Sequence, residues 1–215
     1  MSQQLVIFDW DGTIMDSVYR IVESMQAAAH RAKLNVPTEQ AVKDIIGLSL
    51  APALVQLFGQ LSSDTIALLT QYYRDEYVDA KHSDTPLFDG IEEVLKTLRA
   101  QGYLLAIATG KSRVGLDRLL SESGLAHYFN DSMTADEAQS KPHPEMIDTL
   151  VNRLGVLHEN TVMIGDSVLD MTMAGNANVR AVGVSYGAHT PQVLARANPM
   201  AIVAHPLDLL PHLTP

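Results

Sequence analysis

The fold is decided by the stretch Leu5-Val6-Ile7-Phe8-Asp9-Trp10-Asp11-Gly12-Thr13. Its first four residues form a continuous apolar run with branched side chains, which is typical of a strand buried on both faces of a parallel sheet. Asp11-Gly12 is a turn-forming pair, so the strand is predicted to end before it. In extended backbone, the carboxylates of Asp9 and Asp11 would point to the same side. The stretch therefore predicts a buried strand that carries two acidic groups at its end.

The same pattern of a short apolar run, a turn and a helix returns several times along the chain. Strands alternating with helices indicate a parallel α/β sheet that is doubly wound and Rossmann-like, with ligands at the carboxyl ends of its strands. The predicted strands are 104–108, 161–164 and 180–184, with weaker candidates at 128–133 and 201–204, and the predicted helices are 113–123, 145–154 and 168–177.

Residues 16–83 interrupt this alternation with three or four amphipathic helical patterns and no convincing strand. They predict a small α-helical cap domain inserted after the first strand, while 1–15 and 84–215 form the α/β catalytic core. Ser17 suits the N-cap of the first inserted helix, and the polar, proline-containing segment 83–86 suits the return linker.

The composition excludes several classes of protein. With 215 residues, 47% of them hydrophobic, the chain can bury a full core. Its net charge of −10 disfavours binding to nucleic acid, and the absence of cysteine excludes a disulfide framework and a thiol nucleophile. The apolar run 5–8 is too short for a signal peptide or a membrane span. We therefore expect a cytoplasmic protein with a small-molecule ligand and no nucleic-acid or membrane partner.

Residues suited to a phosphate group also end the later strands. Thr109-Gly110 offers a hydroxyl and a closely approachable backbone N–H, and Lys141 offers a positive charge ahead of a helix. Asp166 ends another strand and Asp170 follows one helical turn later. Each residue alone has an ordinary alternative, a solvated lysine or a helix-capping aspartate. Their occurrence together at one edge of one sheet favours a phosphate site.

In this order, Asp9-x-Asp11-Gly12-Thr13, Thr109, Lys141 and Gly165-Asp166-x3-Asp170 resemble the haloacid dehalogenase superfamily over nearly the whole chain. The helical insertion resembles the cap of the subgroup that contains phosphoglycolate phosphatases and β-phosphoglucomutases. The chain departs from the pattern at Trp10, where a smaller apolar residue is usual, and at Gly110, where Asn is common. Neither departure removes a catalytic atom.

The resemblance implies a Mg²⁺-dependent phosphatase that acts on a small phosphorylated metabolite through an aspartyl-phosphate. Asp9 would be the nucleophile and Asp11 the general acid and base. Asp9, Asp166 and the backbone carbonyl of Asp11 would hold Mg²⁺, with Asp170 supporting its water ligands. Thr109, Gly110 and Lys141 would bind the phosphoryl oxygens.

The segment 46–50 resembles the cap turn that faces the active site in this subgroup, so Gly47 and Ser49 are candidates for substrate specificity. A plain turn between helices explains the same residues equally well.

Four motifs of other functional sites can be excluded from the sequence. A calcium loop would need Glu at its twelfth position, which is Arg20, and a nucleotide-binding P-loop ending in 110–112 would need a glycine at Leu105. The segment 183–187 fits a nucleophile elbow, but too little chain follows it for a catalytic triad. The eight histidines lack the spacing of a zinc site.

Several functional alternatives stay open at this point. A phosphoryl-accepting receiver module uses similar residues but places its lysine last, whereas Asp166 follows Lys141 here. A phosphomutase would need a second phosphate clamp in the cap, where Lys43 is the nearest cation to segment 46–50. A dehalogenase would not need the acid that Asp11 supplies. Phosphoglycolate, sugar phosphates, nucleotides and pyrophosphate all fit the core motifs as substrates, and the sequence does not determine the oligomeric state.

Overall fold

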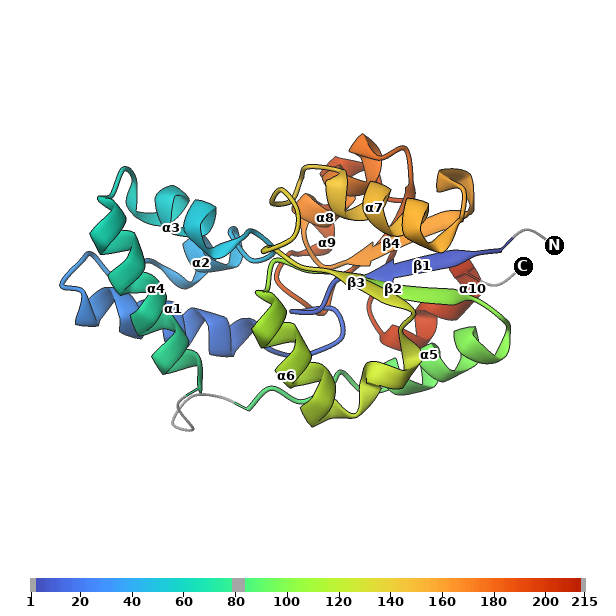
Figure 1. Cartoon of the computed structure of the whole chain (residues 1–215), viewed down its shortest axis with the longest axis horizontal. Helices are drawn as coiled ribbons and strands as arrows, with labels where there is room; N and C mark the ends of the chain where they lie inside the picture. Colours follow the sequence, from blue (N-terminus) through green and yellow to red (C-terminus); the bar gives the residue numbers. More distant parts are fainter. Residues whose placement is uncertain (1–2, 79–83, 214–215) are drawn as a thin grey trace.

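A computed structural model describes residues 3–78 and 84–213 of the chain. Its centre is a sheet of six parallel strands in the order β3-β2-β1-β4-β5-β6 (Figure 1). The order reverses at β1, which lies between β2 and β4, and ligands of such sheets bind at this switch point. The strands are β1 (Leu5–Phe8), β2 (Leu104–Ala108), β3 (Asp131–Met133), β4 (Thr161–Gly165), β5 (Arg180–Val184) and β6 (Ala201–Val203).

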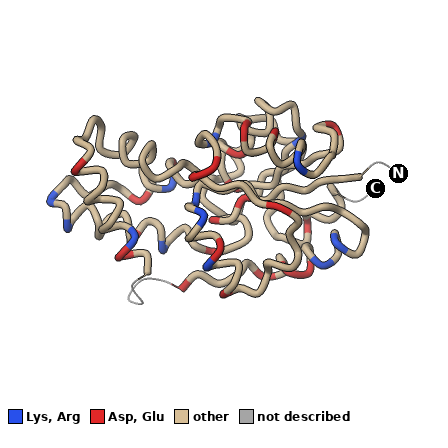
Figure 2. The backbone as a smooth tube through the Cα atoms, in the orientation of Figure 1, with Lys and Arg blue, Asp and Glu red and all other residues tan. Residues whose placement is uncertain are grey.

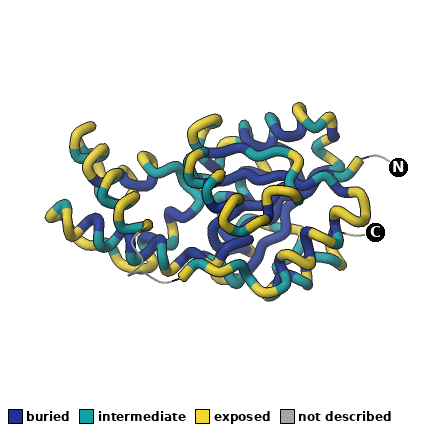
Figure 3. The backbone as a smooth tube through the Cα atoms, turned by 60° about the horizontal axis from the view of Figure 1, so that its bottom comes forward, coloured by how far each residue is buried: buried dark blue, intermediate teal, exposed yellow. Residues whose placement is uncertain are grey.

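Alternate side chains of β1 build the two layers of the core. Val6 and Phe8 pack in one apolar cluster, while Leu5 and Ile7 pack in another on the opposite face of the sheet. All four side chains are fully buried, which explains why the strand is apolar at every position. Figure 3 shows the strands as the buried centre of this part of the molecule, with exposed turns and helix faces around them.

Six described helices belong to the sheet-containing core. Those that face the first cluster include α5 and α6, and those that face the second include α7 and α8. Their bounds are α5 (Ile91–Ala100), α6 (Arg113–Ser123), α7 (Glu145–Leu154), α8 (Val168–Asn176), α9 (Pro191–Leu194) and α10 (Leu210–Leu213), joined by the 3-10 turns Leu125–Tyr128, His158–Asn160, Ala195–Ala197 and Pro206–Leu209.

Four helices between β1 and α5 form a separate helical unit beside the sheet (Figure 1). Their apolar faces meet in a third core cluster, which includes Met25, Leu54 and Leu69. The helices are α1 (Val18–Arg31), α2 (Glu39–Lys43), α3 (Leu50–Phe58) and α4 (Ser63–Val78). We call them together the helical unit. None of the described helices combines the length and the apolar character needed to cross a membrane.

The predicted fold class is confirmed, with a parallel α/β sheet and helices inserted after the first strand. The four strong strand predictions match β1, β2, β4 and β5 within one residue, and the two weaker candidates contain β3 and β6. The division of the chain at residue 83 lies outside the described residues, so those domain limits stay a prediction. Ser17 precedes α1 as expected, but its side chain makes no capping hydrogen bond and donates to Asp11 instead.

Candidate active site

Three buried aspartates meet at the carboxyl end of the sheet. Asp9 follows β1, Asp166 follows β4 and Asp170 lies in the first turn of α8. One carboxylate oxygen from each lies within 4.8 Å of the others, and none of the three side chains is more than 1% exposed. The parallel pairing of β1 with β4 causes this meeting, since it sets Phe8 beside Ile164 and so brings the two strand ends together.

Lys141 is the cation that partly neutralises these aspartates. Its Nζ lies 2.9 Å from Asp9 Oδ1 and 2.6 Å from Asp170 Oδ1, and its side chain is fully buried. Burial by itself lowers the pKa of Lys141, but attraction from Asp170 and Asp9 outweighs this and raises the pKa, so the amine stays charged. Asp170 is fixed further by Ser167, whose Oγ donates to Asp170 Oδ2 over 2.6 Å.

One lysine does not compensate three carboxylates. Burial raises the pKa of Asp9 from 3.8 to about 7, with Lys141 opposing the shift and Asp170 adding to it. Burial also raises the pKa of Asp166 well above its ordinary value, and the charges of Asp170 and Asp9 raise it further. Within the described residues, Asp9 Oδ2 and Asp166 Oδ1 are buried oxygens with no hydrogen-bond partner. The triad could therefore hold a metal ion, whose charge and coordination would satisfy both oxygens.

Gly12 allows this close packing. Its backbone is left-handed, with φ +70°, and a Cβ at this position would overlap with the Oδ2 atom of Asp166. The Oδ2 atom of Asp166 accepts a 2.6 Å hydrogen bond from the Ala188 amide. The turn after β1 can therefore pack directly against the Asp166 carboxylate after β4 because residue 12 has no side chain.

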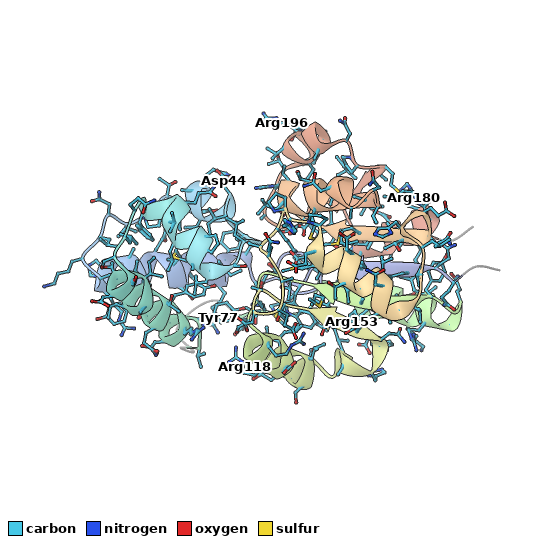
Figure 4. All side chains as sticks on the ribbon, turned by 45° about the horizontal axis from the view of Figure 1, so that its top comes forward. Asp44, Tyr77, Arg118, Arg153, Arg180 and Arg196 are labelled. Atoms are coloured by element: carbon cyan, nitrogen blue, oxygen red, sulfur yellow. The ribbon has the colours of Figure 1, made fainter. Side chains whose placement is uncertain are left out.

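Asp11 lies at the border between the core and the helical unit. Its Oδ1 accepts a 2.6 Å hydrogen bond from Ser17 Oγ and lies 3.0 Å from Lys111 Nζ. Lys111 Nζ also donates to the hydroxyl of Tyr77 on α4 over 3.2 Å and lies 4.6 Å from the centre of that ring. Figure 4 labels Tyr77 where the helical unit faces the core. Lys111 therefore connects an aspartate of the core to a helix of the helical unit.

Asp9 and Asp11, the two acidic residues at the end of the first strand, line the same cavity. The strand ends at Phe8, one residue before Asp9, so the expected orientation of the two carboxylates by extended backbone stays a prediction. A tight turn follows, in which the amides of Ile14 and Met15 donate to the carbonyl of Trp10.

The cavity beside these residues has a volume of about 750 Å³ and lies between the core and the helical unit. Thr109 and Gly110 line it from the end of β2, and Gly47 and Ser49 line it from the turn before α3. Lys141, Asp166 and Asp170 are not among its lining residues; they lie behind Asp9. Figure 2 shows basic and acidic segments close together where the helical unit meets the core.

Gly110 brings the two parts of the chain into contact. A Cβ on Gly110 would lie 2.6 Å from the carbonyl oxygens of both Gly47 and Leu48, closer than such atoms approach. The Ser49 amide donates to Ser140 Oγ over 2.9 Å, so the turn at 47–49 also contacts the loop that carries Lys141. This packing gives a physical reason for glycine at a position where the resembling family often has Asn.

Sequence reasoning missed three polar contacts of this site. Lys111 was set aside with the P-loop motif, although it forms the ion pair with Asp11. Ser17 was taken only as a helix cap, and the Ala188 amide lies just after the segment 183–187 that was set aside as a false nucleophile elbow. The sequence signal for Lys111 was its position two residues after Thr109 at a strand end.

Comparison with known proteins places this geometry in a family. Residues 6–184 match the family described as haloacid dehalogenase-like hydrolase. A protein of Dickeya dadantii (strain 3937) named "Probable phosphatase IndB" is 35% identical over 203 residues, which cover 93% of this chain and 88% of that relative. Phosphoglycolate phosphatase of Vibrio parahaemolyticus is 29% identical over 210 residues, which cover 93% of this chain and 92% of the relative.

A solved structure leads to the same family. A haloacid dehalogenase-like hydrolase from Bacteroides fragilis superposes with a TM-score of 0.88 at 26% identity, covering 97% of this chain and all of the other. The family match spans Asp9, Thr109 and Asp166 at the strand ends and Lys141 in the loop before α7. The resemblance expected from the sequence motifs is thereby confirmed, and the chain belongs to the haloacid dehalogenase-like hydrolase family.

Proposed function

We propose that this hydrolase is a Mg²⁺-dependent phosphatase that releases phosphate from a small phosphomonoester through an aspartyl-phosphate on Asp9. The observation that carries the proposal is the state of Asp9, a buried carboxylate that lines the cavity, is held through Oδ1 by Lys141, and has Oδ2 free of hydrogen bonds within the described residues. The phosphatase names of its relatives support the reaction class.

The residues present fit a magnesium ion. Two unpartnered carboxylate oxygens, on Asp9 and Asp166, are hard oxygen donors of the kind that Mg²⁺ prefers. Together with the backbone carbonyl of Asp11, they would hold the ion, and Asp170 would support it from behind. When bound, Mg²⁺ supplies positive charge that neutralises phosphoryl oxygens facing an anionic nucleophile.

The reaction would then have two displacements at phosphorus. In the first, a carboxylate oxygen of Asp9 forms a bond to phosphorus while the bond to the leaving oxygen breaks, and Asp11 gives that oxygen its proton. In the second, water attacks phosphorus, its proton passes to Asp11, and the acyl-phosphate bond breaks to release inorganic phosphate. Asp11 suits both steps because it lines the same cavity as Asp9 and lies on the side of the helical unit.

Three groups are suited to hold the transferred phosphoryl group. Thr109 offers its hydroxyl and Gly110 its backbone amide from the wall of the cavity, and Lys141 offers, from its place behind Asp9, a charge fixed between Asp9 and Asp170. Fixed donors of this kind stabilise developing charge without reorganising during the reaction.

The helical unit, in our proposal, acts as the cap of this site. It supplies one wall of the cavity and meets the core through Gly47, Ser49 and Tyr77. Closure of such a cap excludes bulk water and lets its side chains select the leaving group. Gly47 and Ser49 stay candidates for that selection.

A phosphomutase is the second candidate because one cation of the helical unit lines the cavity. Lys43 is not that cation, since it pairs with Glu39 and stacks over Tyr19. Arg74 on α4 does line the cavity and could clamp a second phosphate. Incubation with a hexose monophosphate and its bisphosphate separates the two activities, because a mutase yields an isomer whereas a phosphatase yields inorganic phosphate.

Replacing Asp9 by Asn tests the proposal. We expect Asp9→Asn to abolish magnesium-dependent release of phosphate from p-nitrophenyl phosphate, because an amide cannot form the acyl phosphate. Asp16→Asn is the matched control, since Asp16 is an exposed carboxylate in the same loop and should leave turnover unchanged. Turnover retained by the purified Asp9→Asn variant would refute the proposal.

A further inference from the structure

The cavity is larger and less polar than a two-carbon leaving group requires. Its volume of about 750 Å³ lies in the range of roughly 300–1,000 Å³ that is typical of sites for drug-sized ligands. The reacting groups occupy only its core side, where Asp9, Asp11 and Thr109 lie. The rest of the cavity is available to the leaving group, the alcohol to which the phosphate is esterified.

The wall that the helical unit contributes is mainly apolar. Its lining includes Ile21, Met25, Ile45, Leu48, Leu50 and Tyr73. Leu48, Leu50 and Tyr73 are only half-buried, so part of each side chain stays available for contact. Arg74 is the one charged residue that the described part of the helical unit adds to this wall. A small hydrophilic leaving group would leave most of this apolar surface in contact with water. A larger apolar group would remove that surface from water and so gain binding free energy.

Aromatic rings stand at the end of this wall nearest the reacting groups. Tyr73 and Tyr77 are one turn apart on α4, with ring centres 5.9 Å from each other, and Tyr77 contacts Lys111 beside Asp11. A leaving oxygen at Asp11 would therefore place the next part of the substrate against these rings. Planar groups pack well on such surfaces, because aromatic pairs gain more than their buried area alone provides.

From this geometry we infer that the preferred substrate is the phosphate ester of a ring-bearing alcohol, whose ring packs against the wall formed by Leu48, Leu50 and Tyr73. The inference rests on the proposed phosphatase reaction and adds the class of its leaving group. Arg74 and Arg118, which line the cavity from α4 and α6, are placed to bind polar substituents of that ring. Figure 4 labels Arg118 on the core side of the same junction, opposite the helical unit.

Two substrates with the same primary-alcohol chemistry test this inference. Ethyl phosphate and 2-phenylethyl phosphate have the same type of leaving oxygen and differ in the ring. We expect kcat/KM of the full chain with Mg²⁺ to be at least about tenfold higher for 2-phenylethyl phosphate, since even one methylene group in an apolar pocket changes kcat/KM by about 10–200-fold. Equal values for the two esters would overturn the inference.

Substitutions in the apolar wall test whether its residues cause the preference for the ring-bearing ester. Tyr73→Ala and Leu50→Ser should each lower kcat/KM for 2-phenylethyl phosphate at least threefold more than kcat/KM for ethyl phosphate, which has no ring to lose contact with the wall. Leu68→Ala is the control on α4, because Leu68 is 44% exposed and is not a lining residue. Equal losses on both substrates in both wall variants would overturn the assignment. Failure of the phosphatase proposal is distinguishable, because it would appear as no Asp9-dependent phosphate release from either ester.

Discussion

Replacing Lys141 by Met removes the charge that joins Asp9 to Asp170 and keeps a flexible side chain of similar length in the core. The Nζ atom lies 2.9 Å from Asp9 and 2.6 Å from Asp170, and neither oxygen can turn to bulk water. Breaking a buried ion pair by removing one partner costs about 3–5 kcal/mol of unfolding free energy. In a chain of this size each kcal/mol lowers Tm by about 2–4 °C, so the expected loss is roughly 6–20 °C.

Thermal unfolding in EDTA, followed by circular dichroism at neutral pH, measures this loss. Excess Mg²⁺ should restore part of it in Lys141→Met, because a cation bound by Asp9 and Asp166 compensates the same negative charge. Lys96→Met is the control, since Lys96 is exposed on α5 and should change the unfolding free energy by less than about 0.5 kcal/mol. A decrease in Tm of less than about 3 °C for Lys141→Met would refute the view that Lys141 is the main compensating charge.

Three other perturbations follow from the same geometry. Lys111→Met should lower kcat about tenfold or more, while Tyr77→Phe should change kcat less than threefold, because Lys111 contacts Asp11 directly whereas Tyr77 contacts only Lys111. Equal effects of the two variants in steady-state kinetics would contradict this. Gly110→Ala should lower kcat/KM at least tenfold, because its Cβ would force the turn at Gly47 away from the core; unchanged kinetics would contradict that contact. The metal-free protein should lose stability as pH rises from about 4 to about 7, because folded Asp9 holds its proton up to about pH 7 and the unfolded chain releases it near pH 3.8. Chemical unfolding at several pH values checks this, and Mg²⁺ should reduce the slope.

Much of the fold could be predicted because the strands are buried on both sides and therefore apolar at every position. β1 and β2 show this most clearly, and their predicted limits match the structure. The edge strands β3 and β6 are three residues long, and such short runs carry little signal of their own. The helices α9 and α10 are single turns, which no periodicity can reveal.

The candidate site was less predictable wherever a contact depends on the helical unit. Asp9, Lys141 and Asp166 could be found because each follows a recognisable strand or precedes a recognisable helix. The contact of Lys111 with Tyr77 depends instead on where α4 lies relative to the end of β2, and no local pattern encodes that arrangement. The same reason explains why Gly110 was predicted as a phosphate-binding residue and as a departure from Asn, while its close approach to Gly47 was missed.

The central position of β1 also has a consequence for how the protein is made. β1 is near the start of the chain, yet its neighbours in the sheet are β2 and β4, which pair Leu5 with Leu104 and with Thr161. Long-range pairing of this kind slows folding, because distant segments must meet before their contacts stabilise them. A nascent chain released from the ribosome before residue 170 would still carry Asp9 but would lack Asp170. We therefore expect Asp9, Asp166 and Asp170 to come together only late in synthesis, after β4 and the first turn of α8 have been made.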